Sequence, residues 1–151
     1  MKTSIPILNF RGPHRWLSNF YPVIIVADWC GEPRTYGSVE HAYQAAKTLD
    51  PSWERYVREA PTPGAAKYRG QQVSCRPQWD EIKIDVMLGM VRIKFACPFL
   101  SGQLLATGDA HLEEGNTHGD RFWGTVMGLG ENHLGKILMQ VRTELREGGP
   151  R

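Results

Sequence analysis

The alternation of apolar and polar residues divides the chain into a short β-rich beginning and a long helical remainder. The stretch Val23–Val26 is apolar and mostly β-branched, which favours a strand. Turn residues follow at Gly31–Pro33, and Thr35–Tyr36 is the expected partner strand. Beyond Gly37 the apolar residues recur at helical spacing, so the character of the chain changes there.

Six helices are expected after this point, some from apolar residues at helical spacing and others from proline residues that mark a helix start. The expected helices are Ser38–Thr48, Ser52–Glu59, a short one through Ala66 and Tyr68, Asp80–Ala96, one that opens at Pro98, and His133–Glu147. Ser38 and Asn132 are the expected caps of the first and the last helix. Two apolar stripes run along Asp80–Ala96, so we expect this helix to be contacted on most sides. The polar, glycine-rich stretch His111–Gly130 predicts a long ordered loop, a kind of segment that often carries function.

These elements predict a mainly α protein with a small antiparallel β element, in the α+β class. The 151 residues suit one compact domain over residues 1–147, followed by a disordered tail at 148–151. Apolar and charged residues make up 41% and 23% of the chain, which is ordinary for a globular protein. The net charge of +2 gives no argument for non-specific binding to nucleic acid.

The three cysteines lie far apart and show no spacing typical of a zinc site. Because complete pairing of three is impossible, we expect Cys30, Cys75 and Cys97 to be reduced thiols, with Cys97 packed at the end of an apolar helix. His118 and His133 fit no standard metal-binding spacing, so no metal is expected. No segment has the uncharged apolar length of a membrane span. A cytoplasmic protein without a membrane partner is therefore expected.

One predicted helix carries a row of polar residues that could act on a ligand. Glu40, Gln44 and Lys47 are spaced i, i+4 and i+7, so they share one helix face. A carboxylate, an amide and an ammonium in one row could clamp a polar ligand. In the alternative interpretation Glu40 simply lies in the first turn, where the helix dipole favours an acid, and the other two are solvated. Spacing alone favours this second interpretation.

Three further places hold residues of the right chemistry. Asp120 lies in the glycine-flanked loop and could position a water or bind ribose hydroxyls, and Trp123 in the same loop could stack on a base. Asn19 lies among aromatic residues and can both donate and accept hydrogen bonds. Trp79 directly precedes the long helix. For each of these residues an ordinary turn or a buried aromatic anchor is the alternative.

Four segments that contain these residues resemble the YbiA-like, or NADAR, proteins. The matching segments are Trp16–Pro22, Ser38–Lys47, Glu114–Thr117 with Asp120–Gly124, and Gly130–Met139. They occur in the order of the family and at similar separations. The likeness extends from about Phe10 to Glu147, which is nearly the whole chain.

This resemblance implies a compact, largely α-helical domain that acts as an N-glycosidase without a metal or organic cofactor. Some family members cleave the ribosylamine phosphate intermediates of early riboflavin synthesis, and others remove ADP-ribose from guanine bases of nucleic acid. The family's catalytic glutamate falls on Glu40. The other site residues implied are Trp79, Asp120 and Trp123, and by position Asn19, Gln44 and Lys47 belong to the same pocket. Gly119 is a departure, because family members often place a polar or aromatic residue beside this aspartate.

The resulting hypothesis is hydrolysis of the C1′–N bond between a base or amine and a ribose that carries phosphate or ADP. Glu40 would supply negative charge near C1′ and activate water, or form a short-lived covalent adduct. Asp120 would orient the ribose or assist proton transfer, the two tryptophans would stack, and Lys47 would bind phosphate, with Arg11 or Arg69 as weaker candidates. The alternative functions are a non-catalytic module that binds ADP-ribose or NAD, and a structural protein with a solvated polar stripe.

Overall fold

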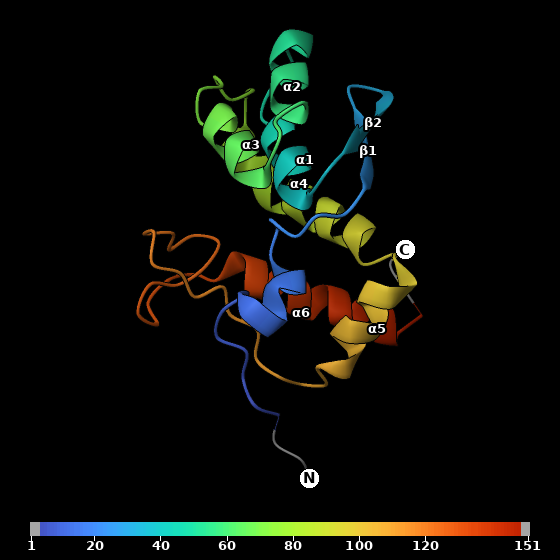
Figure 1. Cartoon of the computed structure of the whole chain (residues 1–151), viewed down its shortest axis with the longest axis vertical. Coiled ribbons are helices and arrows are strands. Elements are labelled where there is room, and N and C mark those ends of the chain that lie inside the picture. Colours follow the sequence, from blue (N-terminus) through green and yellow to red (C-terminus); the bar gives the residue numbers. More distant parts are fainter. Residues whose placement is uncertain (1–3, 149–151) are drawn as a thin grey trace. The chain divides into compact units, whose positions relative to one another are not determined.

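The structure, a computed structural model, describes residues 4–148 and divides the chain into two compact units. One unit comprises Met1–Ser18 and Phe95–Arg151, and the other comprises Asn19–Lys94. Within the described residues there are seven helices and one two-stranded antiparallel sheet (Figure 1), which confirms the expected mainly α protein with a small β element. The predicted disordered tail lies outside the described residues except for Gly148, and the single domain over residues 1–147 stays a prediction.

The unit Asn19–Lys94 begins with a β-hairpin. Strand β1 (Ile25–Trp29) pairs with β2 (Glu32–Tyr36), and the two residues Cys30 and Gly31 form the turn, both with positive φ. A two-residue turn of this kind matches the twist of the two strands. The turn was predicted at Gly31–Pro33 but lies at Cys30 and Gly31, so that prediction was wrong for Pro33. Pro33 lies inside β2, where a proline is tolerated because the strand pairs on one side only.

Three short helices follow the hairpin and contact one another (Figure 1): α1 (Val39–Ala45), α2 (Pro51–Arg58) and α3 (Pro63–Gly70). The side chains of Ser38, Asp50 and Thr62 cap their N-termini by accepting backbone N–H groups. The expected cap at Ser38 is thus confirmed. Helix α1 ends earlier than its apolar period suggested, so Lys47 lies just beyond the helix.

Helix α4 (Trp79–Lys94) is the longest helix of this unit and contacts α1 and β1. Its buried residues include Trp79, Met87 and Val91, whereas Ile84 and Ile93 remain more than a third exposed. The expectation of contact on most sides was therefore wrong for part of the helix, since apolar residues at two stripes do not require both stripes to be covered.

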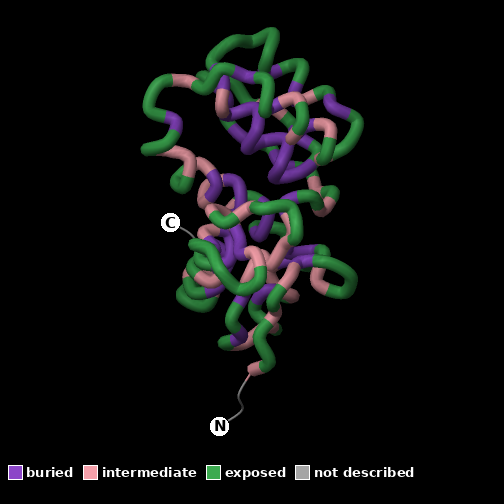
Figure 2. Tube along the Cα trace, turned by 90° about the vertical axis from the view of Figure 1, so that its left-hand side faces the viewer, coloured by how far each residue is buried: buried purple, intermediate pink, exposed green. Residues whose placement is uncertain are grey.

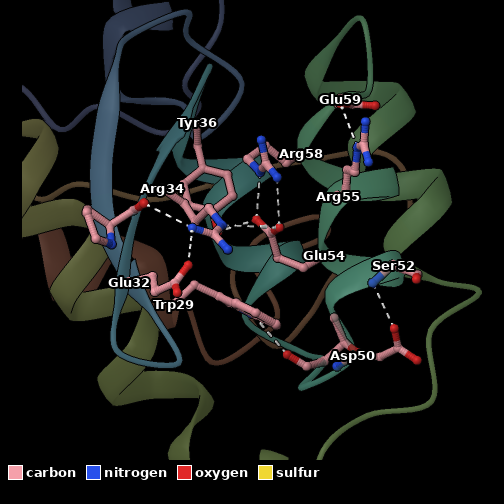
Figure 3. A network of polar contacts seen from close by, with 12 residues as sticks. Trp29, Glu32, Arg34, Tyr36, Asp50, Ser52, Glu54, Arg55, Arg58 and Glu59 are labelled. Atoms are coloured by element: carbon pink, nitrogen blue, oxygen red, sulfur yellow. Dashed lines mark hydrogen bonds and ion pairs between the residues drawn. The ribbon is translucent and has the colours of Figure 1, made fainter.

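A buried carboxylate ties the hairpin to α2 (Figure 3). Glu54 is 1% exposed and accepts a hydrogen bond from the Tyr36 hydroxyl at 2.8 Å and two from the Arg58 guanidinium at 2.9 and 3.2 Å. Arg34 Nε approaches its other side at 3.7 Å. Burial, followed by the hydrogen bond to Glu54, raises the pKa of Tyr36 well above its usual range. This network holds β2 against α2 and positions the helices that surround α1.

The other unit contains a 3-10 helix, η1 (Gly12–Leu17), with α5 (Pro98–Ala106) and α6 (His133–Arg146). Figure 2 shows runs of buried positions within each unit, and here they come from the apolar residues Leu17, Phe95, Leu104, Leu134 and Leu138. The predicted start of a helix at Pro98 is confirmed. Cys97, which we expected to be packed, is exposed, as are the other two free cysteines.

A long irregular segment joins α5 to α6, as the composition of His111–Gly130 predicted. The side chain of Asn116 organises it, because Nδ2 donates to the carbonyls of Asp120 and Thr125 and Oδ1 accepts from the Asp120 N–H. Asn132 precedes α6 in a left-handed conformation but makes no side-chain cap. It instead bonds the backbone of Leu112 and Glu114, so the expected capping role of Asn132 was wrong.

Candidate active site

The carboxylate of Glu40 is the centre of the candidate site. Glu40 lies in the first turn of α1 and is 7% exposed. Gln44, one turn further along the helix and 4% exposed, donates a hydrogen bond from Nε2 to Glu40 Oε2 at 2.6 Å. The expected position of Glu40 in the first turn is confirmed, whereas the interpretation of Gln44 as part of a solvated face was wrong. An amide N–H donor stabilises the ionised form of a carboxylate, because that form can only accept.

The backbone of α1 at this point is held from two sides. The Ser38 hydroxyl accepts the His41 N–H and lies 2.7 Å from His41 Nδ1, and His41 Nε2 lies 2.9 Å from the Ala60 carbonyl oxygen. The Asn19 carbonyl accepts the Glu40 N–H at 3.1 Å. Hydrogen bonds therefore hold the first turn of α1 in place, in addition to its helix propensity. They fix the backbone position from which the Glu40 side chain extends.

Close packing against α3 restricts Gln44. A Cβ atom added at Gly70 would lie only 2.1 Å from Gln44 Oε1, so glycine alone permits this approach of the two helices. Among the described residues Oε1 has no hydrogen-bond partner, and it is buried. The orientation of the amide is set by the carboxylate, which requires the NH₂ group to face Glu40.

Asn19 is the second predicted site residue that the structure brings to Glu40. It is buried, its backbone carbonyl binds the Glu40 N–H, and its Nδ2 lies 3.5 Å from the Met87 sulfur. Sulfur is a weak acceptor, so this amide retains much of its capacity to donate a hydrogen bond to a ligand.

An aromatic and a cationic side chain lie close to Tyr43, in the middle of α1. Its ring centroid lies 5.3 Å from that of Trp79 and 5.8 Å from Lys47 Nζ. Burial lowers the pKa of the Lys47 ammonium, an effect that Cys75 and Glu40 oppose and that Lys67 and Lys83 reinforce. Trp79 and Lys47 thus both lie close to Tyr43 of α1, and their roles as site residues stay a prediction.

Tyr43 is the residue that the sequence analysis missed. It was assigned to the apolar period of the helix, yet it contacts two of the predicted site residues. Its position, three residues after Glu40 and four before Lys47, places it on the same side of the helix. This spacing was the available signal.

A half-open cavity of about 310 Å³ adjoins Trp79. Its lining residues are Cys75, Arg76, Gln78, Trp79, Asp80 and Glu81. The segment that leads into it is tied to the end of α1, because the Arg76 N–H donates to the Lys47 carbonyl at 2.7 Å. Among the lining residues, Arg76 carries a positive charge and Asp80 and Glu81 carry negative charges. A polar ligand beside the Trp79 indole could therefore meet both signs of charge.

Asp120 and Trp123 belong to the other unit and form a local turn there. Asp120 Oδ1 accepts the backbone N–H groups of Phe122 and Trp123 at 3.1 and 2.9 Å. The Trp123 ring is partly buried and meets Phe122 edge-on at 4.9 Å between centroids, with His133 at 6.3 Å. Gly119 has a positive φ of 86°, so the residue that departs from the family pattern occupies a position that favours glycine.

The weaker phosphate candidates have different surroundings. Arg11 is exposed in the unit that contains Asp120. Arg69 stacks on Tyr56 and donates a hydrogen bond to its backbone carbonyl. Lys47 is therefore the phosphate candidate that the structure associates with Glu40.

Within residues 4–148, no three or more His, Cys, Asp or Glu side chains form a group that could hold a metal ion. In the same part of the chain no helix combines the length and apolar character required to cross a membrane.

Comparison with known proteins gives a consistent picture. The sequence model of the NADAR domain matches residues 9–146. The riboflavin biosynthesis protein VVA0006 of Vibrio vulnificus is 43% identical over 91% of this chain, and the chloroplastic riboflavin biosynthesis protein PYRR of Zea mays is 37% identical over 85%. The chain spans only 37% and 23% of the length of these two relatives.

Shorter relatives match along most of their length. The N-glycosidase YbiA of Escherichia coli is 36% identical, covering 74% of this chain and 72% of that protein. The solved NMR structure of E. coli YbiA superposes with a TM-score of 0.83 at 32% identity, covering 97% of this chain and 89% of the other. The expected YbiA-like fold is thereby confirmed. This chain belongs to the NADAR domain family.

Proposed function

We propose that this chain hydrolyses the N-glycosidic bond between C1′ of a phosphorylated or ADP-linked ribose and a base or amine. The observation that carries the proposal is a buried carboxylate, Glu40, held by Gln44, with Tyr43 on the same helix and the Lys47 cation just beyond its end. The name N-glycosidase, given to relatives that match over most of their length, supports the same class of hydrolase.

Cleavage of a ribosyl C1′–N bond passes through a transition state with positive charge at C1′, like that of O-glycoside hydrolysis. Glu40 stabilises this charge and removes a proton from the attacking water. The leaving base departs with the electron pair of the C1′–N bond and takes up a proton. A covalent adduct of Glu40 with C1′, which water then cleaves, is the second route open to the same carboxylate.

The remaining site residues bind and orient the substrate in this proposal. Lys47 binds a phosphate oxygen, and Asn19 donates a hydrogen bond. Trp79 and Trp123 stack on the base or sugar. Asp120 orients the ribose or assists proton transfer.

Two substrate classes fit this arrangement: ADP-ribosyl-guanine in nucleic acid, and the ribosylamine phosphate intermediates of riboflavin synthesis. The names of the two longer relatives support the second class, and a phosphate for Lys47 is common to both. The proposed reaction uses water and the side chains of the protein and includes no cofactor. A cytoplasmic location, where both substrates would occur and the three free cysteines would stay reduced, remains part of the proposal.

The test compares the wild type with Glu40→Gln on both substrates at one salt concentration. Glu40→Gln should still bind ADP-ribose, seen as a raised melting temperature, but release base at least about a hundredfold more slowly. Glu59→Gln, a change at an exposed glutamate, is the matched control. Near-normal turnover by Glu40→Gln would refute the catalytic role. Binding of ADP-ribose by the wild type without release of base would instead identify a non-catalytic binding module.

A further inference from the structure

Two aromatic side chains lie exposed on the outer face of α2. Trp53 and Tyr56 are 37% and 40% exposed, although Glu54 and Val57 on the inner face are almost fully buried. The two rings are spaced i, i+3 and meet at 5.8 Å in an edge-on contact. The buried side of α2 is therefore formed by other residues, and each of the two aromatic residues stays more than a third exposed.

A cation from α3 completes this surface. The Arg69 guanidinium carbon lies 4.4 Å from the centroid of the Tyr56 ring, and its Nη1 donates to the Tyr56 carbonyl at 2.8 Å. No carboxylate of residues 4–148 forms an ion pair with it, whereas Arg55 and Arg58 are paired with Glu59 and Glu54 (Figure 3). Arg69 is thus a fixed positive charge that is not neutralised within the described protein.

Helix α3, which carries Arg69, also contacts the candidate active site. Gly70, the neighbour of Arg69, packs directly against Gln44. Burial lowers the pKa of the Lys47 ammonium, and the charge of Lys67, earlier on α3, adds a smaller effect in the same direction. Helix α3 therefore places one positive charge beside the site and a second one beside the exposed aromatic rings.

We propose that Trp53, Tyr56 and Arg69, here called the aromatic–arginine face, bind a single strand of nucleic acid that flanks the reacting nucleotide. Nucleobases stack on exposed aromatic rings irrespective of sequence, and an unpaired arginine binds the phosphate backbone. The uncompensated charge of Arg69 favours a polyanion over a protein partner. The inference rests on the proposed function in one respect: the strand would be the one that carries the modified guanine.

Binding is measured by fluorescence anisotropy with an unmodified single-stranded DNA of about 12 nucleotides, an RNA of the same sequence and the DNA duplex. Both single strands should bind, and the duplex should bind more weakly because its bases are already stacked. Trp53→Ala should weaken binding of the single strands by about fivefold or more. Arg69→Gln should weaken it and lower the slope of log Kd against log salt by about 0.7.

Phe99→Ala, which removes an exposed aromatic of α5 in the other unit, is the matched control and should bind like the wild type. Circular dichroism checks that each variant folds. Because Trp53 and Arg69 lie on different helices, one variant still tests the inference if the other fails to fold. Equal affinity of the wild type, Trp53→Ala and Arg69→Gln would overturn the inference.

The outcome is separable from the proposed function. Release of ADP-ribose from ADP-ribosyl-guanosine, which has no flanking strand, should be unchanged in Trp53→Ala. Release from the modified oligonucleotide at limiting concentration should fall by the same factor as the affinity. If the wild type releases ADP-ribose from neither substrate, ADP-ribosyl-guanine fails as the substrate class of the proposed function, while strand binding is still measured. Normal release from both substrates without any strand binding would overturn only the inference and leave a protein as the partner of this face.

Discussion

Gln44 Nε2 lies 2.6 Å from Glu40 Oε2, and both side chains are almost completely buried. This hydrogen bond joins residues one helical turn apart, so the helix itself sets the direction of the carboxylate. A carboxylate that is buried and oriented before substrate arrives needs little rearrangement when charge develops at C1′. The predictions below test this arrangement and the framework around it.

Replacing Gln44 by leucine removes the donor and keeps a side chain of similar volume. A hydrogen bond to a charged group contributes about 1.5–3 kcal/mol, so kcat should fall roughly tenfold or more, with a smaller change in KM. Steady-state kinetics well below the melting temperature measure this. An unchanged kcat in a folded variant would show that Gln44 does not orient Glu40.

The Lys47 ammonium should make substrate binding sensitive to alkaline pH. Burial lowers its pKa below the ordinary 10.5, and the amine is charged only below its pKa. As the pH is raised, the KM for a phosphorylated substrate should therefore begin to increase before the pH reaches 10.5.

Lys47→Arg provides the control, because an arginine keeps its charge throughout this range. Its KM should stay flat with pH, and Lys47→Ala should have a high KM at every pH. Parallel profiles for the wild type and Lys47→Arg would exclude Lys47 as the phosphate ligand.

Asp120 requires a variant that separates structure from chemistry, since its Oδ1 holds the turn at Phe122 and Trp123. Asparagine retains this acceptor but removes the negative charge. Asp120→Asn should keep the melting temperature and lose activity, whereas Asp120→Ala should lose both. Full activity of Asp120→Asn, measured with the same substrates, would reduce Asp120 to a turn residue.

Glu54 of α2 and Glu59, which directly follows that helix, allow a matched test of the framework (Figure 3). Glu54 is 1% exposed and binds Tyr36 and Arg58, whereas Glu59 is mostly exposed and pairs with Arg55 at 3.2 Å. Glu54→Ala should lower the free energy of unfolding by about 3–5 kcal/mol, because it leaves buried partners without an acceptor. Glu59→Ala should change it by less than about 1 kcal/mol. Urea denaturation compares them, and similar losses would mean that burial of Glu54 adds nothing.

Local features of the chain could be predicted from the sequence because they depend on neighbouring residues. Apolar residues at helical spacing predicted α1, α4 and α6, and Ser38 and Pro98 mark helix starts by their own chemistry. Predictions based on residue preference alone were less accurate. Pro33 suggested a turn but lies in β2, and Asn132 suggested a cap but its side chain binds the backbone of Leu112 and Glu114.

The row Glu40, Gln44 and Lys47 was visible in the sequence, and the resemblance pointed to it. Spacing could not decide whether that row faces water or a pocket, because helix periodicity describes a face and not what covers it. Tertiary packing decided this: α3 approaches Gln44 at Gly70, the Asn19 carbonyl binds the Glu40 backbone, and Trp79 reaches Tyr43 from α4. The sequence by itself therefore determined the helices and the residue types of the site. Contacts between residues distant in the chain determined which of these residues are buried together.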